Sequence, residues 1–311
     1  MILLLLSCTE PVPYEPNDTQ EDTGWWSEVD TDTDADADSD TDADTDSDTD
    51  TDAAADYREP GPYSVSSSTG TATTSCSMAL TTFTPDGGGE GPRVILAHGF
   101  ARAPANVEGW AEQMASHGLE VVTPALCHAS IWDSDHDANG EDLVALNQAL
   151  GGGDVIYAGH SAGGLAAVLA ASQDSDAVAV MGLDLTDADG LGEAAAKKLD
   201  VPAYGLLGEA GSCNSSGNGE AVYAKASEAI ALRVTEADHC DFEDATDELC
   251  TWVCTGTNNQ FDDAAIQQAI RGLSTAAVVH EAGLGEGLEG WWMPGEGPYE
   301  ELLSSGAISE L

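Results

Sequence analysis

The chain has 311 residues, with 57 Asp and Glu against 8 Lys and Arg and a formal net charge of −49. A surface this acidic repels nucleic acid and anionic lipid, which excludes DNA-binding and RNA-binding functions. The length allows one large domain of about 240 residues, enough for a substantial core, together with a tail.

The first eight residues, MILLLLSC, form a short apolar run that ends in Ser7-Cys8. Leu5-Leu6-Ser7-Cys8 resembles the lipobox of bacterial lipoproteins, in which a signal peptide is cut before a cysteine that then carries lipid. The run is shorter than usual, and no basic residue precedes it. We expect an exported lipoprotein, lipidated at Cys8, at the cell surface or outer membrane; the alternative is a secreted or periplasmic protein. No other stretch approaches the ~20 apolar residues that span a bilayer, so a lipid anchor is the expected membrane contact.

Residues 9–56 are polar, and Asp occupies every second position from Asp30 to Asp52. The alternation gives no apolar face, and neighbouring carboxylates repel one another, so the sequence predicts a disordered, extended spacer. Calcium binding is an alternative role for the spacer. It would be weak, since the turn glycine and bidentate Glu of an ordered calcium loop are missing.

Residues 57–311 are predicted to form the folded domain, in which short apolar runs alternate with stretches of helical spacing. Strands are predicted at 75–84, 93–97, 119–124, 154–158, 177–183, 201–207 and 230–235, and helices at 104–117, 139–150, 165–171, 194–199 and 262–279. This alternation predicts an α/β fold, with a mostly parallel sheet covered by helices on both faces.

A G-x-S-x-G pentapeptide, Gly159-His160-Ser161-Ala162-Gly163, lies between one of these strands and a helix. In that context it predicts a sharp turn that lifts Ser161 above the edge of the sheet as a nucleophile. The alternative is a glycine-rich turn in which the serine only caps a helix.

A serine nucleophile needs a histidine base and a carboxylate that orients the base, in the chain order Ser, acid, His for this architecture. Two histidines follow Ser161; we expect His239, just past the strand at 230–235, to be the base, and His280 to be structural. The preferred acid is Asp184, because a carboxylate directly after so apolar a strand needs a reason to be there. Glu209 and Asp187 are the alternative acids.

The expected oxyanion hole consists of the backbone N–H groups of Ala162 and Phe100, with Phe100 also lining an acyl pocket. His98 is expected to order its loop rather than to react. A group of His and Asp residues lacks the spacing of metal ligands and is expected at the rim of the cleft: His128, His136, Asp133, Asp135 and Asp137. No metal or cofactor is expected.

Seven cysteines are present, so lipidation of Cys8 leaves an even number for three disulfides in an oxidising compartment. Clustering along the chain favours Cys76 with Cys127, and bridges among Cys213, Cys240, Cys250 and Cys254. A zinc site formed by His239, Cys240, Cys250 and Cys254 is the alternative, although its spacing matches no common zinc module.

About half of the chain, from Val94 to Phe242, resembles the α/β-hydrolase superfamily, and within it the cutinase-like polyester hydrolases (including poly(ethylene terephthalate) hydrolases) and the chlorophyllases. The segments that carry the resemblance are 98–101 with Trp110, 115–118, 121–122 and 159–164. The polyester hydrolases place their acid where this chain has Gly211, whereas 182–185 is similar to the chlorophyllase segment that supplies the acid. The resemblance therefore favours Asp184.

Together these patterns predict an exported serine hydrolase, expected to be a monomer, that cleaves a small, lipid or polymeric carboxylic ester through an acyl-enzyme. The alternative is a non-catalytic surface protein with a hydrolase fold and an acidic spacer that binds calcium.

Overall fold

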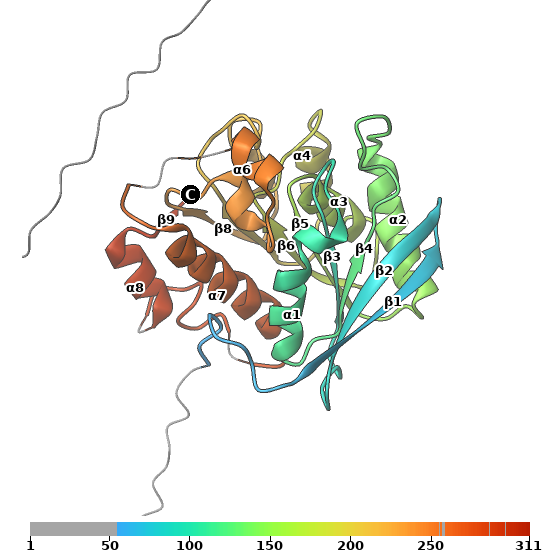
Figure 1. Ribbon diagram of the computed structural model, residues 1–311, viewed down its shortest axis with the longest axis horizontal. Helices are drawn as coiled ribbons and strands as arrows, with labels where there is room; N and C mark the ends of the chain where they lie inside the picture. The colour runs from blue at the N-terminus through green and yellow to red at the C-terminus, as the bar shows by residue number, and fades with distance from the viewer. Residues whose placement is uncertain (1–54, 255, 257–258, 286, 296) are drawn as a thin grey trace, which may run out of the picture. The chain divides into compact units, whose positions relative to one another are not determined.

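The computed structural model describes residues 55–254, 256, 259–285, 287–295 and 297–311 (Figure 1). The predicted signal segment, the lipidation site Cys8 and residues 9–54 of the predicted spacer lie outside the described residues.

The described part is built on a nine-stranded sheet with the order β1-β2-β4-β3-β5-β6-β7-β8-β9. The six strands from β4 to β8 in this order are parallel, and β1, β2 and β9 are antiparallel additions at the two edges. The strands are β1 (Val65–Thr73), β2 (Ser77–Pro85), β3 (Arg93–Ala97), β4 (Val121–Pro124), β5 (Val155–His160), β6 (Ala177–Leu183), β7 (Ala203–Leu207), β8 (Ala229–Val234) and β9 (Ile308–Glu310). The predicted fold class, α/β with a mostly parallel sheet, is confirmed.

Helices cover both faces of this sheet, as Figure 1 shows. They are α1 (Glu108–Ser116), α2 (His136–Ala149), α3 (Ala162–Ala171), α4 (Leu191–Ala196), α5 (Glu220–Tyr223), α6 (Glu248–Cys254), α7 (Asp263–Glu281) and α8 (Pro298–Ser305), with 3-10 helices η1 (Pro104–Asn106) and η2 (His239–Phe242). One hydrophobic cluster holds residues of α1 and α7, and a second holds residues of α2, α3 and α4. All six residues of β5 are buried, which explains its uninterrupted apolar sequence.

The predicted strands at 93–97 and 177–183 match β3 and β6, and the other predicted elements are found with shifted ends. The sequence did not predict β1, α5, α6, α8 or β9. Seven of the nine residues of β1 are exposed, so it lacks the buried face from which a strand is predicted. The remaining four elements are eight residues long or shorter, too short for a clear period.

Three disulfides connect the six described cysteines: Cys76–Cys127, Cys213–Cys254 and Cys240–Cys250. The first is the predicted pair, and the other two lie within the predicted group of four. The alternative zinc site is not formed in the oxidised protein, because Cys240 is bonded to Cys250 and Cys254 is bonded to Cys213. Three disulfides indicate an oxidising environment outside the cytoplasm. Within the described residues, no helix combines the length and hydropathy needed to cross a bilayer.

Candidate active site

The parallel strands place the predicted catalytic and oxyanion-hole residues at one edge of the sheet. The register pairs Ala97 of β3 with Gly159 of β5, and Leu183 of β6 with both His160 of β5 and Leu206 of β7. Because these strands end together, the segments that follow them converge at the carboxyl edge, where such folds hold their chemistry.

Ser161 occupies a strained turn between β5 and α3, with φ 56° and ψ −123°. The flanking glycines permit the turn. A Cβ atom on Gly159 would lie 2.3 Å from the carbonyl carbon of Gly163, and one on Gly163 would lie 2.4 Å from the carbonyl oxygen of Ala97. Strain of this kind at a serine is typical of a nucleophile held in place by its surroundings.

Ser161, His239 and Asp184 form a continuous hydrogen-bonded chain. The Ser161 Oγ lies 2.9 Å from Nε2 of His239, and Nδ1 of His239 lies 2.6 Å from Oδ2 of Asp184. Asp184 is fully buried and follows β6, while His239 begins η2 beyond β8. The structure thus brings together the three residues that the sequence singled out, in the geometry that serine activation requires.

The two alternative acids have other partners. Asp187 accepts hydrogen bonds from the backbone N–H groups of Gly192 and Glu193, so it caps the start of α4. Glu209 is exposed, and its carboxylate accepts from the backbone N–H of Glu236. Among the described residues, Asp184 is the carboxylate bonded to His239.

The predicted oxyanion-hole groups belong to the two segments beside Ser161. Ala162 is the first residue of α3, and Phe100 follows Gly99, where a Cβ atom would lie 3.1 Å from Cβ of Ser161. In the described part of the chain, neither the Phe100 nor the Ala162 N–H donates to a protein oxygen. Both donors are therefore available to a substrate oxygen.

His98 holds the loop that carries Phe100. Its Nδ1 lies 2.8 Å from the carbonyl oxygen of Gly99, and its Nε2 accepts from the N–H of Leu126 at 3.1 Å. Burial lowers the pKa of His98 to about 4, so the ring stays neutral and both contacts persist at neutral pH. His98 therefore orders this loop, as expected from the sequence.

His160, the variable residue of the pentapeptide, supports the catalytic candidate His239. Its Nε2 donates to the carbonyl oxygen of His239 at 3.0 Å, and the centres of the two rings are 4.6 Å apart. Burial holds the pKa of His160 well below its usual range, so it stays a neutral donor. Nothing in the sequence pointed to this contact.

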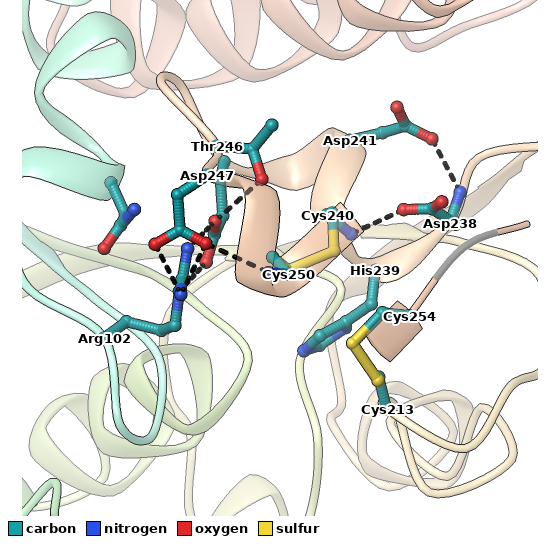
Figure 2. Close-up of a disulfide and its surroundings, with 12 residues drawn as sticks. Arg102, Cys213, Asp238, His239, Cys240, Asp241, Thr246, Asp247, Cys250 and Cys254 are labelled. Carbon is teal, nitrogen blue, oxygen red and sulfur yellow. Dashed lines mark hydrogen bonds and ion pairs between the residues drawn. A yellow bond between two sulfur atoms is a disulfide. The ribbon is translucent and has the colours of Figure 1, made fainter. Parts of the chain in front are cut away.

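A buried ion pair lies beside His160. Arg102 donates to both carboxylate oxygens of the fully buried Glu243 and also pairs with Asp247, which is drawn in Figure 2. The pair joins the loop that carries Phe100 to the segment after η2, and bidentate geometry makes this connection specific.

A groove of about 320 Å³ opens over Ser161. Its lining includes Phe100, Arg102, His239, Glu243 and Val253. Helix α6 forms one wall, held by two bridges that flank His239 in Figure 2: Cys240–Cys250 and Cys213–Cys254. The groove has the size of a small-molecule site, and the phenyl ring and the disulfides make part of its wall apolar.

The His and Asp residues expected at the rim lie elsewhere. His128 bonds Asp133 at 2.9 Å, and Asp135 caps the start of α2. None of the five residues in this group lines the groove. In the part of the chain that the structure describes, the group of side chains close enough to hold a metal ion consists of three disulfide-bonded cysteines.

Asn214 is a second site residue whose role sequence reasoning missed. It lies in the loop after β7, and its side-chain amide bonds the carboxylate of Asp184. An asparagine within a Gly-Ser-rich loop resembles any turn residue, so the sequence held no indication of this contact.

The chain matches no protein-family model, and the curated proteins include none with significant similarity to it.

Proposed function

We propose that this protein is an exported serine hydrolase that cleaves carboxylic esters through an acyl-enzyme. The observation that carries the proposal is the hydrogen-bonded chain of Ser161, His239 and Asp184, with distances of 2.9 and 2.6 Å. The resemblance of residues 94–242 to the α/β-hydrolase superfamily also supports it.

In the proposed acylation step, His239 Nε2 takes the proton of Ser161 as Oγ bonds to the ester carbonyl carbon. Asp184 accepts from Nδ1 of His239 and stabilises the imidazolium that forms. The N–H groups of Phe100 and Ala162 donate to the carbonyl oxygen as it becomes negative. The imidazolium then protonates the leaving alkoxide, and the alcohol departs.

In deacylation, water replaces the alcohol. His239 removes a proton from the water as its oxygen attacks the acyl carbon, and the proton returns to Ser161 Oγ when the acyl–oxygen bond breaks. The product is a carboxylic acid, which ionises at neutral pH. A protein with a net charge of −49 favours departure of this anion.

Labelling with a fluorophosphonate tests the nucleophile. Intact-mass analysis of the wild-type protein should show one added phosphonyl group, and Ser161→Ala should abolish it. Ser212→Ala is the matched control, because Ser212 is exposed in the loop after β7 and should leave labelling unchanged. Labelling that persists without Ser161, or no labelling of the wild type, would refute the proposal and favour a non-catalytic surface protein.

Nitrophenyl esters of increasing acyl length, measured beside a nitroanilide, test the reaction class. The groove of about 320 Å³ suits short and medium acyl chains, so kcat/KM should pass through a maximum along the series. Cleavage of the anilide at a comparable rate would replace the ester assignment with an amidase.

The membrane anchor is a separate proposal. We propose that Cys8 carries lipid and that the Asp-rich segment keeps the enzyme away from the membrane. Metabolic labelling of the full chain with an alkyne fatty acid in a bacterial host should mark the wild type and not Cys8→Ser. Equal labelling of both chains, or of neither, would contradict it.

A further inference from the structure

Among the residues that the structure describes, no Lys or Arg side chain pairs with the buried carboxylate of Asp184. Its salt-bridge partner within the described residues is His239, which is neutral in the resting state of the proposed mechanism. A buried carboxylate is costly unless N–H groups stabilise its charge. The groups that supply those N–H donors therefore affect how well the Asp184 carboxylate can orient His239.

Three groups of the described chain donate to this carboxylate. His239 Nδ1 lies 2.6 Å from Oδ2, and the backbone N–H of Gly208 lies 2.9 Å from Oδ1. The third donor is the amide of Asn214, whose Nδ2 is 3.1 Å from Oδ2 and 3.3 Å from Oδ1. Among these three groups, Asn214 is the one whose nitrogen contacts both oxygens of the carboxylate.

The amide of Asn214 is itself held in one orientation. The side chain is 1% exposed, and its Oδ1 accepts from the N–H groups of Gly211 and Gly217 at 2.8 and 3.0 Å. Its Nδ2 also donates to the carbonyl oxygen of Glu209 at 2.8 Å. A flipped amide would lose all of these bonds, so the donors must face Asp184.

The loop around Asn214 is shaped to present this side chain. Ser215, Ser216 and Gly217 follow with φ of 50°, 62° and 73°, a left-handed run that non-glycine residues rarely adopt. Cys213, on the other side, is bridged to Cys254 of α6. Strained backbone persists where the surrounding structure over-determines it, commonly at functional sites.

We propose that Asn214 is a positioning residue of the active site. It orients the carboxylate of Asp184 and stabilises its charge, so that Oδ2 stays aligned with Nδ1 of His239 throughout the reaction. This inference rests on the proposed hydrolase function. It adds a fourth residue, contributed by the loop after β7, to the three identified from the sequence.

Asn214→Ala removes the amide nitrogen that contacts both oxygens of Asp184. We expect kcat to fall about 10- to 100-fold, the usual effect of losing a hydrogen bond to a buried charged group. KM should change less than about two-fold, because Asn214 is buried and lines the adjoining cavity of about 440 Å³ rather than the groove over Ser161. A variant that only loosened the loop and α6 would change KM as well.

Asn218→Ala is the matched control. Asn218 lies four residues later, and its amide bonds the backbone of Asp187 through both its oxygen and its nitrogen, without touching Asp184. It should therefore lower stability in a similar way while leaving kcat unchanged. Thermal unfolding of both variants separates the loss of stability from the loss of function.

A proton NMR experiment observes the contact directly, even if turnover is too slow to measure. The Nδ1–H of His239 should give the most downfield proton resonance, assigned by its loss in Asp184→Asn. The charged neighbours of His239 along the chain are Asp238, the N-cap of η2, and Asp241 within η2, and the neutral ring of His160 lies 4.6 Å from the His239 ring and beside the Arg102–Glu243 pair. The resonance should shift and broaden in Asn214→Ala and stay unchanged in Asn218→Ala.

The outcomes separate this inference from the proposed function. If fluorophosphonate labels the wild type while Asn214→Ala keeps kcat within about two-fold and leaves the resonance in place, Asn214 is a structural residue and the hydrolase assignment stands. If the wild type is not labelled, the proposed function itself fails. Loss of kcat together with a shifted resonance supports the inference; should Asn214→Ala fail to fold, Asn214→Ser is measured by the same criteria.

Discussion

Replacement of Asp184 by asparagine tests the arrangement most directly, because it keeps the shape of the side chain and removes its charge. In the native site, Oδ1 accepts from the N–H of Gly208 at 2.9 Å and Oδ2 faces Nδ1 of His239 at 2.6 Å. In Asp184→Asn, the amide oxygen should take the place beside Gly208, which turns the new NH₂ group toward His239.

That NH₂ group can only donate, so the histidine must present an unprotonated Nδ1 and carry its proton on Nε2. The protonated Nε2, 2.9 Å from Ser161, then cannot accept the serine proton. A wrong tautomer of this kind costs about 10⁴ in kcat, equivalent to about 5 kcal/mol of activation free energy.

The assay is hydrolysis of 4-nitrophenyl acetate by wild type, Asp184→Asn and Glu209→Gln, with thermal unfolding measured alongside. Glu209→Gln should retain activity within about three-fold, since surface substitutions have small effects and its carboxylate contacts the backbone of Glu236 rather than the histidine. If Asp184→Asn stays within ten-fold of wild type, or Glu209→Gln loses as much activity as it does, the assigned acid is wrong.

Three further predictions concern stability. Burial raises the pKa of Asp241 from 3.8 to about 7, so its contribution to stability is present below the unfolded pKa and is lost as pH rises through about 7. The Tm of Asp241→Asn should therefore exceed that of wild type by an amount that grows between pH 5 and pH 8; a constant difference in Tm would contradict this. Raising NaCl from 0.1 to 1 M shortens the Debye length from about 10 to about 3 Å and should raise the Tm of a protein with a net charge of −49, whereas a flat or falling Tm would show that repulsion is unimportant. Replacing Cys213 and Cys254 by alanine should lower the free energy of unfolding more than replacing Cys240 and Cys250, because the bridges close loops of 41 and 10 residues, worth about 4 and about 3 kcal/mol. Chemical denaturation of both variants would show the reverse order if the chain-entropy argument failed.

Elements with a strong local pattern were predictable. The run at 177–183 is apolar throughout, the run at 93–97 is apolar after Arg93, and they became β6 and β3 in the middle of the sheet. Most of β1 is exposed and polar, and it owes its place to pairing along its whole length with β2, so no local pattern marked it as a strand. Helix α6, of seven residues, is too short to show a period, and two disulfides hold it in place.

The candidate site divides in the same way. Ser161 was identified because glycines at fixed offsets are a local requirement of the turn, and His239 because it follows a strand at the edge where such chemistry lies. The choice among Asp184, Asp187 and Glu209 stayed open in the sequence, since each follows a strand or lies close to its end. Their side-chain partners distinguish them. Asp187 caps α4, Glu209 bonds the backbone of Glu236, and Asp184 bonds the imidazole of His239.

The sequence by itself determined the α/β alternation and the serine turn, because each depends on residues that are close together along the chain. The number of cysteines is also read directly from the sequence. The tertiary structure alone decided that Asp184 reaches His239, 55 residues away, and that Asn214 orients Asp184 across a separation of 30 residues. Hydrogen bonds over such separations depend on where the sheet register and the loops place each side chain. No spacing along the chain records that placement.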